Sequence, residues 1–201
     1  MMRPLNTRRQ FLIPAGVAAT ATALPLPAFA LSSEQAQGLV TSAVNDINTI
    51  IASGGSEAAM IRQFEGIFDR YADTVYIASF ALGNDRRSAS QSQIQAFVEA
   101  FRTYVAAKYG RRFREFIGGQ ITVVNAKAVN SWIEVETTVA LRNQSPFRVD
   151  FHVSDRPGKP VFFNLIIEGV NMLLSERTEI GAMLDRRGGN IDALINDLRN
   201  S

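Results

Sequence analysis

The stretch WIEVETTVALRNQSPFRVDFHVSDRPGKPVFFNLIIEG, residues 132–169, decides the fold. Apolar residues alternate with others in three successive runs, and this period of two is typical of half-buried strands. Residues 143–146 and 155–160 separate the runs with turn-forming residues. The pattern predicts an antiparallel meander with one apolar face. That face takes Ile133, Val135, Thr137, Val139 and Leu141 from the first run, Phe147, Val149, Phe151 and Val153 from the second, and Val161, Phe163, Leu165 and Ile167 from the third.

The first thirty residues have the three parts of a cleaved export signal. Arg3, Arg8 and Arg9 form a basic start, and residues 11–24 are an apolar run that is too short for a membrane span. Residues 28–30, Ala-Phe-Ala, match a small-residue cleavage site. The pair Arg8-Arg9 also resembles the twin-arginine export signal, and an ordinary secretion signal leads to the same compartment. We therefore expect a soluble periplasmic protein in which residues 31–201 form a single domain.

Composition excludes several classes of function. Without the three arginines of the export signal, 18 Lys and Arg face 19 Asp and Glu, so the charge balance gives no indication of nucleic-acid binding. The chain contains no cysteine, which excludes thiol catalysis and zinc–thiolate or iron–sulfur sites. About 170 residues remain, enough for one domain with a sizeable core.

Helical patterns lie on both sides of the predicted strands. Ser32, Ser56, Asp73, Ser90 and Asn190 are placed to begin helices, and a further helix is expected to end at Arg187 before two glycines. The helix after Ser90 carries the longest aromatic stripe, so we expect it to cover the sheet. The third strand is expected to continue past Gly169, with that glycine as a bulge or bend. Together with a strand at 121–126, the pattern predicts an α+β fold with a sheet of about four strands.

The sequence offers little material for catalysis. Asp150, His152 and Ser154 share a strand face, but alternate side chains stand roughly 7 Å apart, too far for a nucleophilic relay. Glu134, Glu136 or Asp150 is a candidate base only if the fold is a cone-shaped isomerase, and each lies on the polar side of its strand. Scattered carboxylates do not indicate a metal site. We therefore expect no enzyme activity, no cofactor and no metal.

Residues 64–118, FEGIFDRYADTVYIASFALGNDRRSASQSQIQAFVEAFRTYVAAKYGRRFREFIG, resemble the MlaC family of periplasmic phospholipid-binding carriers. The resemblance continues through Val149-Asp150, residues 163–170, then Arg177 and Glu179, and finally residues 189–194. It covers essentially the whole chain after the export signal. It implies a curved sheet and helices that enclose an apolar cavity for phospholipid cargo. It also implies an inner-membrane ABC transporter complex with an MCE-domain subunit and an outer-membrane lipoprotein complex as partners, and a role in maintaining outer-membrane lipid asymmetry.

This resemblance places lipid-binding residues on the apolar face of the sheet and on two helices. Each of them is equally well explained as ordinary core. Three alternatives stay open: a hopanoid carrier of the same family, a cone-fold isomerase or hydratase, and an adaptor whose apolar face is fully packed. The arginine clusters at 86–87 and 111–114 are either contacts for anionic groups or solvated helix ends. The expected lipid-binding residues are Tyr76, Phe80, Leu82, Phe97, Phe101, Tyr104, Val135, Val139, Val149, Phe151, Phe163 and Ile167.

Overall fold

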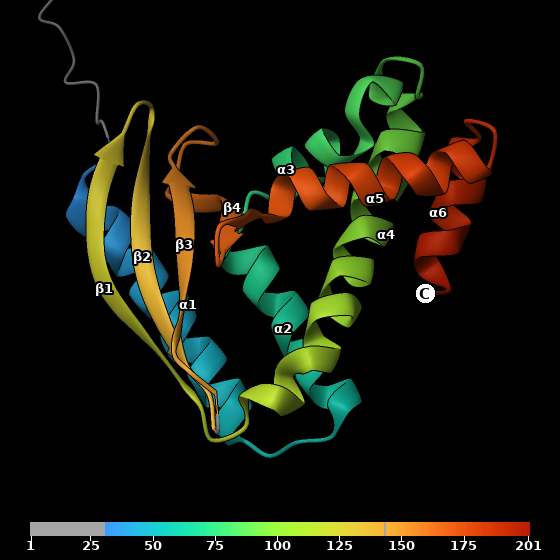
Figure 1. The fold of residues 1–201 in the computed structure, drawn as a ribbon. Coiled ribbons are helices and arrows are strands. Elements are labelled where there is room, and N and C mark those ends of the chain that lie inside the picture. The colour runs from blue at the N-terminus through green and yellow to red at the C-terminus, as the bar shows by residue number, and fades with distance from the viewer. Residues whose placement is uncertain (1–30, 143) are drawn as a thin grey trace, which may run out of the picture.

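The computed structural model describes residues 31–142 and 144–201, with the backbone alone for 112–114. The expected export signal lies outside the described residues. Within the described residues, four helices precede a sheet, and two helices follow it (Figure 1). The helices are α1 (Ser33–Ala52), α2 (Glu57–Tyr71), α3 (Thr74–Leu82), α4 (Gln91–Gly110), α5 (Met172–Arg186) and α6 (Ile191–Arg199), with short 3-10 turns η1 (Gly83–Arg87) and η2 (Arg111–Phe116). The strands are β1 (Gln120–Val129), β2 (Trp132–Ala140), β3 (Phe147–Ser154), β4 (Val161–Ile167) and β5 (Val170–Asn171).

The sheet is an antiparallel meander in the order β1-β2-β3-β4-β5. The α+β prediction is confirmed, with five strands in place of about four. β1 is longer than the predicted 121–126, and a bulge between Val123 and Asn125 interrupts its pairing with β2. The apolar sides of β2 and β3 are buried as the alternation predicts, because side chains of one parity share one face.

The predicted face of β4 is wrong at Val161 and Phe163. Val153 pairs with Phe162 while His152 pairs with Asn164, so Phe163 is an extra residue in a bulge. The bulge shifts the side chains by one position, and Phe162 replaces Phe163 on the inner face. Phe162 accordingly packs edge-on against Phe151.

The third strand also ends earlier than predicted. Glu168 and Gly169, both with positive φ, turn the chain back so that β5 pairs with β4 as a short hairpin. At the other end of β4, Asp73 donates a backbone hydrogen bond to the Phe162 carbonyl. The outer edge of β4 is therefore occupied at both ends.

Helix starts follow the predicted caps. Ser32 and Ser90 form complete capping boxes, and Ser56, Asp73 and Asn190 each accept a backbone N–H in the first turn. Asn171 caps α5 in the same way. Among the described residues, no helix combines the length and apolar character needed to cross a bilayer.

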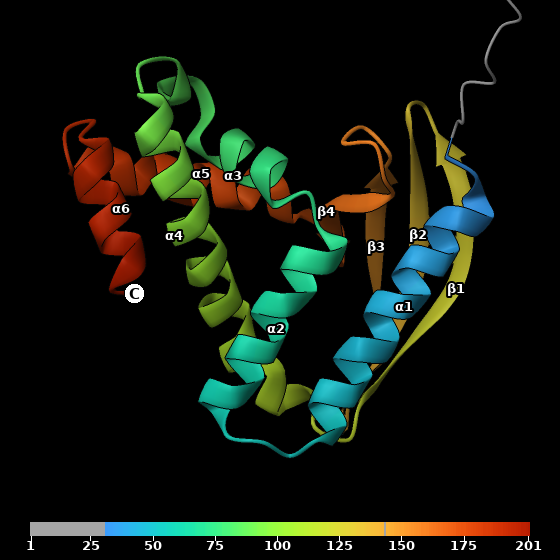
Figure 2. The same cartoon turned by 180° about the vertical axis from the view of Figure 1, so that it is seen from behind.

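The helix that covers the sheet is α1, not α4 as predicted. α1 lies along the sheet (Figures 1 and 2) and buries Ala36, Val40 and Val44 in one cluster with Val135 and Val139. α4 packs mainly on α2, α3 and α6. The structure thus has a sheet layer covered by α1 and a second layer of helices that stands away from it.

Candidate functional site

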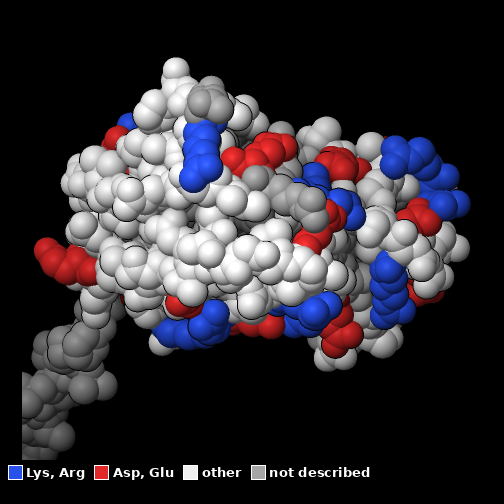
Figure 3. Space-filling view, turned by 90° about the horizontal axis from the view of Figure 1, so that it is seen from below, with Lys and Arg blue, Asp and Glu red and all other residues white. Residues whose placement is uncertain are grey.

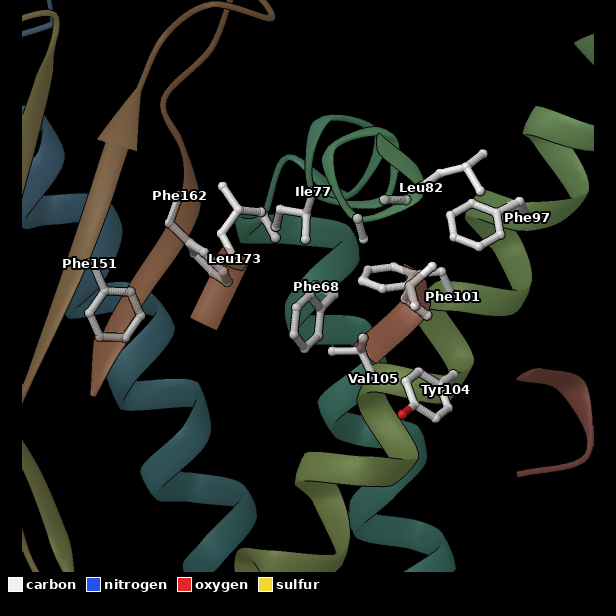
Figure 4. Close-up of a cluster of buried hydrophobic side chains, with 14 of the residues drawn as sticks. Phe68, Ile77, Leu82, Phe97, Phe101, Tyr104, Val105, Phe151, Phe162 and Leu173 are labelled. Carbon is white, nitrogen blue, oxygen red and sulfur yellow. The ribbon is translucent and has the colours of Figure 1, made fainter. Parts of the chain in front are cut away.

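A cavity of about 680 Å³ lies between the two layers. Its sheet wall comes from the inner face of β2, β3 and β4, including Val139, Val149 and Phe151. Figure 4 shows Phe151 and Phe162 on the sheet side, Phe101 and Val105 on α4 opposite them, and Phe68 of α2 between. The volume falls in the range usual for small-molecule sites, and the lining is mostly aliphatic and aromatic.

Three polar residues in the lining are buried. The Thr137 hydroxyl donates to the Val149 carbonyl at 2.8 Å. Asn164 Oδ1 accepts the backbone N–H groups of Leu165 and Leu173, so this side chain fixes the start of α5 against the β4 bulge. Glu176 differs from both, because its Oε2 atom is buried without a hydrogen-bond partner.

Glu176 belongs to a group of polar side chains that joins α4 to α5. We refer to Tyr104, Lys108, Tyr109, Glu176 and Glu179 as the α4–α5 polar cluster. Lys108 Nζ contacts Glu176 Oε1 at 2.8 Å and Glu179 Oε2 at 2.5 Å. The Tyr109 hydroxyl donates to the same Oε1 at 2.5 Å, and the Tyr104 hydroxyl donates to Glu179.

Burial and hydrogen bonds within the α4–α5 polar cluster shift the pKa values of Tyr104, Tyr109 and Glu179. Burial, followed by the hydrogen bond to a carboxylate, raises the pKa of both Tyr104 and Tyr109. Burial alone would raise the pKa of Glu179, but hydrogen bonds from Lys108 and Tyr104 lower it below the ordinary value. The cluster therefore keeps protonated phenols beside a charged carboxylate at neutral pH.

The carboxylates proposed as candidate bases lie on the opposite face of the sheet. Arg148 contacts Asp150 at 2.6 Å, Glu136 at 3.3 Å and Glu134 at 3.4 Å. None of these three carboxylates borders the cavity. No group of three or more metal-ligating side chains occurs in the described part of the chain.

The structure brings half of the expected lipid-binding residues to the cavity. Phe101, Val139, Val149, Phe151, Phe163 and Ile167 border it, although the Phe163 ring packs on Tyr76, Trp132 and His152. Val135 and Tyr104 are buried elsewhere, Tyr76 and Phe80 are partly buried beside the core, and Leu82 and Phe97 border a separate space of about 190 Å³ next to Arg86 and Arg87. Contact with lipid stays a prediction for all twelve.

Sequence patterns missed several residues of the lining. Phe68 and Val105 lie on apolar helix stripes that carry no sign of a cavity, and Phe162 was assigned to the other face. No local sequence pattern indicated that Glu176 belongs to the site, because its hydrogen-bond partners are more than 60 residues away in the chain.

The fold and the cavity together define an α+β protein with an apolar cavity between its sheet and its helices. The chain belongs to the MlaC family: residues 40–200 match the sequence profile described as MlaC protein. It is also similar to a phospholipid-binding protein from Ralstonia solanacearum, solved at 1.53 Å in complex with a phospholipid. The two share 19% sequence identity at a TM-score of 0.68, over 83% of this chain and 96% of that chain. At this identity the likeness shows a common fold.

Proposed function

We propose that this protein is a phospholipid carrier of the periplasm, without catalytic activity. The observation that carries the proposal is the apolar cavity of about 680 Å³ between the sheet and the helices. Membership of the MlaC family and a fold shared with a phospholipid-bound protein support it. The export signal expected in the first thirty residues supports the compartment.

The size of the cavity indicates how much of a lipid it holds. A methylene group takes roughly the 30 Å³ of a water molecule in the liquid, so the cavity encloses about 22 carbon atoms. Two chains of sixteen carbons need about 40% more space. The cargo therefore keeps its headgroup and the first carbons of its chains at the opening, unless the two layers move apart.

Burial of the chains explains why a carrier exchanges lipid only at a membrane complex. At about 0.8 kcal/mol for each buried methylene, about 22 carbons cost on the order of 18 kcal/mol to expose to water. Spontaneous release is thus negligible. Transfer of the acyl chains between the cavity and a bilayer moves them from one apolar environment to another, so the free-energy change of the transfer is close to zero. Docking at an inner-membrane transporter complex and an outer-membrane lipoprotein complex would therefore determine when lipid moves.

The decisive experiment is native mass spectrometry of the protein purified without detergent from a periplasmic extract, with identification of any bound lipid. We expect a diacyl phospholipid on a chain that begins at Leu31. A hopanoid would favour the alternative carrier. Protein without lipid, which also takes none from vesicles, would overturn the proposal.

A cavity-filling variant ties the bound lipid to this cavity. Val149→Phe adds four carbons to the wall, so we expect the total number of acyl carbons in the bound lipid, summed over both chains, to fall by about four at the same volume per carbon. Val124→Phe is the matched control, because Val124 is exposed on β1 away from the lining. An unchanged lipid profile in Val149→Phe would mean that the chains lie elsewhere.

One observation favours an isomerase or hydratase as a second candidate. Such an enzyme needs a carboxylate inside the apolar cavity, and Glu176 is buried in the lining. One of its oxygens is already held by Lys108 and Tyr109. Turnover separates the candidates: an isomerase or hydratase converts an apolar substrate in the wild type and loses that turnover in Glu176→Gln, whereas a carrier shows no turnover in either protein.

A further inference from the structure

His152 is the only histidine of the chain, and histidine is the side chain whose ordinary pKa lies between about pH 5 and 8. It does not border the cavity, and it lies on the side of the sheet that carries Glu134 and Arg148. Seen from below, charged side chains surround a broad area without charge (Figure 3). That uncharged area keeps its character as the pH falls, whereas His152 gains a charge.

A chain of hydrogen bonds joins His152 to the cavity wall. Asn164 Oδ1 accepts the backbone N–H groups of Leu165 at 2.9 Å and of Leu173 at 3.1 Å. The Asn164 amide nitrogen Nδ2 therefore points the other way, and it lies 3.4 Å from His152 Nδ1. Asn164, Leu165 and Leu173 all border the cavity, and Asn164 is only 6% exposed. Asn164 thus connects His152 directly to the first turn of α5.

The network requires a neutral imidazole in one tautomer. Because Asn164 Nδ2 is a donor, His152 Nδ1 has to be the acceptor, and the ring carries its hydrogen on Nε2. Nε2 lies 3.5 Å from Glu134 Oε2, so this N–H faces a carboxylate. Burial lowers the pKa of His152, although Glu134 and Asp150 act to raise it. The ring is therefore neutral at pH 7.5 and gains a proton as the pH falls below 6.5.

Side chains from all the neighbouring elements surround the imidazole. They are Lys127 of β1, Trp132, Glu134 and Glu136 of β2, Arg148 and Asp150 of β3, and Phe163 of β4, with Tyr76 of α3 behind Phe163. Glu134 is already paired with Lys127 at 2.9 Å and Arg148 at 3.4 Å, so only part of its charge acts on the ring. The Trp132 and Phe163 rings lie 5.5 and 5.9 Å from the imidazole and restrict its movement.

Protonation of the ring disrupts the contact with Asn164. An imidazolium donates from both nitrogens, so its Nδ1–H meets the donor Nδ2. If the Asn164 amide keeps its orientation, two donors face each other where Asn164 is buried. If the amide rotates, Oδ1 accepts a charge-assisted hydrogen bond from the ring, but Leu165 and Leu173 lose their acceptor. Both arrangements weaken the attachment of the first turn of α5 to the sheet.

We propose that protonation of His152 loosens the cavity wall at the start of α5 and thereby accelerates lipid exchange in acid. The inference rests on the proposed carrier function, because the cargo lies against this wall. α5 runs from the sheet into the layer of helices (Figure 1), so a freer start of α5 lets the two layers move apart. That movement supplies the extra volume that two full chains need. At neutral pH the wall stays closed and the lipid is retained.

Amide hydrogen exchange followed by NMR tests the switch independently of lipid transfer. After correction for the intrinsic effect of pH, we expect the protection of the Leu165 and Leu173 amides to be about fivefold lower at pH 5.0 than at pH 7.5, the factor for one hydrogen bond of average strength. The Ala193 amide is the matched control, because it donates to the Asn190 side chain at 3.0 Å in α6 and should keep its protection. His152→Gln keeps an acceptor and a donor but does not titrate, so its protection should not fall.

The transfer rate is measured on the same proteins. Protein loaded with a fluorescent phosphatidylcholine is mixed with excess phosphatidylcholine vesicles, whose headgroup keeps its charge between pH 7.5 and 5.0. We expect transfer to be about fivefold faster at pH 5.0 in the wild type and equally fast at both pH values in His152→Gln. Asn164→Asp should also lose the acid effect, because a carboxylate accepts hydrogen bonds from both backbone amides and from the imidazolium.

The two measurements distinguish failure of the switch from failure of the carrier function. Equal protection of Leu165 and Leu173 at both pH values, or an equal fall in His152→Gln, would overturn the inference. A fall in protection without faster transfer would overturn the link between the switch and the lipid. If no protein takes up lipid while the protection still responds to pH, the carrier function is wrong and only the local switch stands.

Discussion

Replacement of Lys108 by methionine should destabilise the fold well beyond the loss of a surface charge. Lys108 contacts Glu176, whose side chain is 4% exposed, and Glu179, which is 44% exposed. Without Lys108 the buried Glu176 carboxylate keeps only the hydrogen bond from Tyr109. A buried pair broken on one side costs about 3–5 kcal/mol. Because 27% of the Lys108 side chain is exposed and water can enter there, we expect a loss of about 2–3 kcal/mol in the free energy of unfolding.

Urea denaturation provides the assay, with fluorescence of Trp132, the only tryptophan of the chain. In a thermal unfolding experiment the same loss in free energy would lower the melting temperature by roughly 4–12 °C for a domain of this size. Lys127→Met is the matched control, because Lys127 pairs with Glu134 at 2.9 Å but is 56% exposed. That control should cost less than about 1 kcal/mol.

The double variant Lys108→Met with Glu176→Leu separates charge burial from packing. If the uncompensated carboxylate causes the loss, the double variant should lose less than the sum of the two single variants, with a coupling of about 1–3 kcal/mol. A Lys108→Met loss no larger than that of Lys127→Met, or strictly additive losses, would refute this account of the α4–α5 polar cluster.

Two further expectations concern the sheet and its connection to the helices. Burial lowers the pKa of His152 although Glu134 opposes it, so the unfolded chain binds the proton more tightly. The stability that the neutral, buried His152 contributes is complete above pH 6.5 and declines as the pH falls below it. The urea midpoint should therefore drop more between pH 7.5 and 5.5 in the wild type than in His152→Gln. Equal drops would contradict a lowered pKa of His152. Gly119→Ala brings a Cβ within 2.6 Å of the Ala140 carbonyl oxygen and should cost about 1–3 kcal/mol by thermal unfolding. Gly181→Ala lies in α5 with open space around the new methyl group and should instead stabilise the protein by about 0.5–1 kcal/mol. If both variants changed the free energy of unfolding in the same direction, the close contact at Gly119 would relax without cost.

Local chemistry made much of the fold predictable. Helix starts at Ser32 and Ser90 depend on hydrogen bonds within three residues, and the inner faces of β2 and β3 depend on a simple alternation. β4 was misassigned because its bulge at Phe163 arises from pairing with β3, which no pattern inside β4 reveals. The aromatic stripe of α4 likewise predicted burial correctly but could not show that α1 is the helix on the sheet.

The candidate site was harder to predict than the fold. A cavity wall and a packed core require the same apolar residues, so the alternation placed Val139 and Val135 together although only Val139 borders the cavity. Glu176 depends on contacts across 67 and 68 residues of chain, and the sequence around it reads as an ordinary helix. Family resemblance supplied the expectation of a cavity, and the structure alone located it.

We expect the bulge in β1 to hinder pairing of this edge strand with a second copy of the chain. An open sheet leaves a free edge, and a flat edge strand is a template for another chain. Among the described strands the two edges are the two-residue β5 and the longer β1. The Asn48 side chain of α1 hydrogen-bonds both the N–H and the carbonyl of Ile121 on the outer side of β1. The ladder of β1 is broken after Val123, and Lys127 carries a charge along it. The sheet can thus keep an open edge without offering a flat template for aggregation.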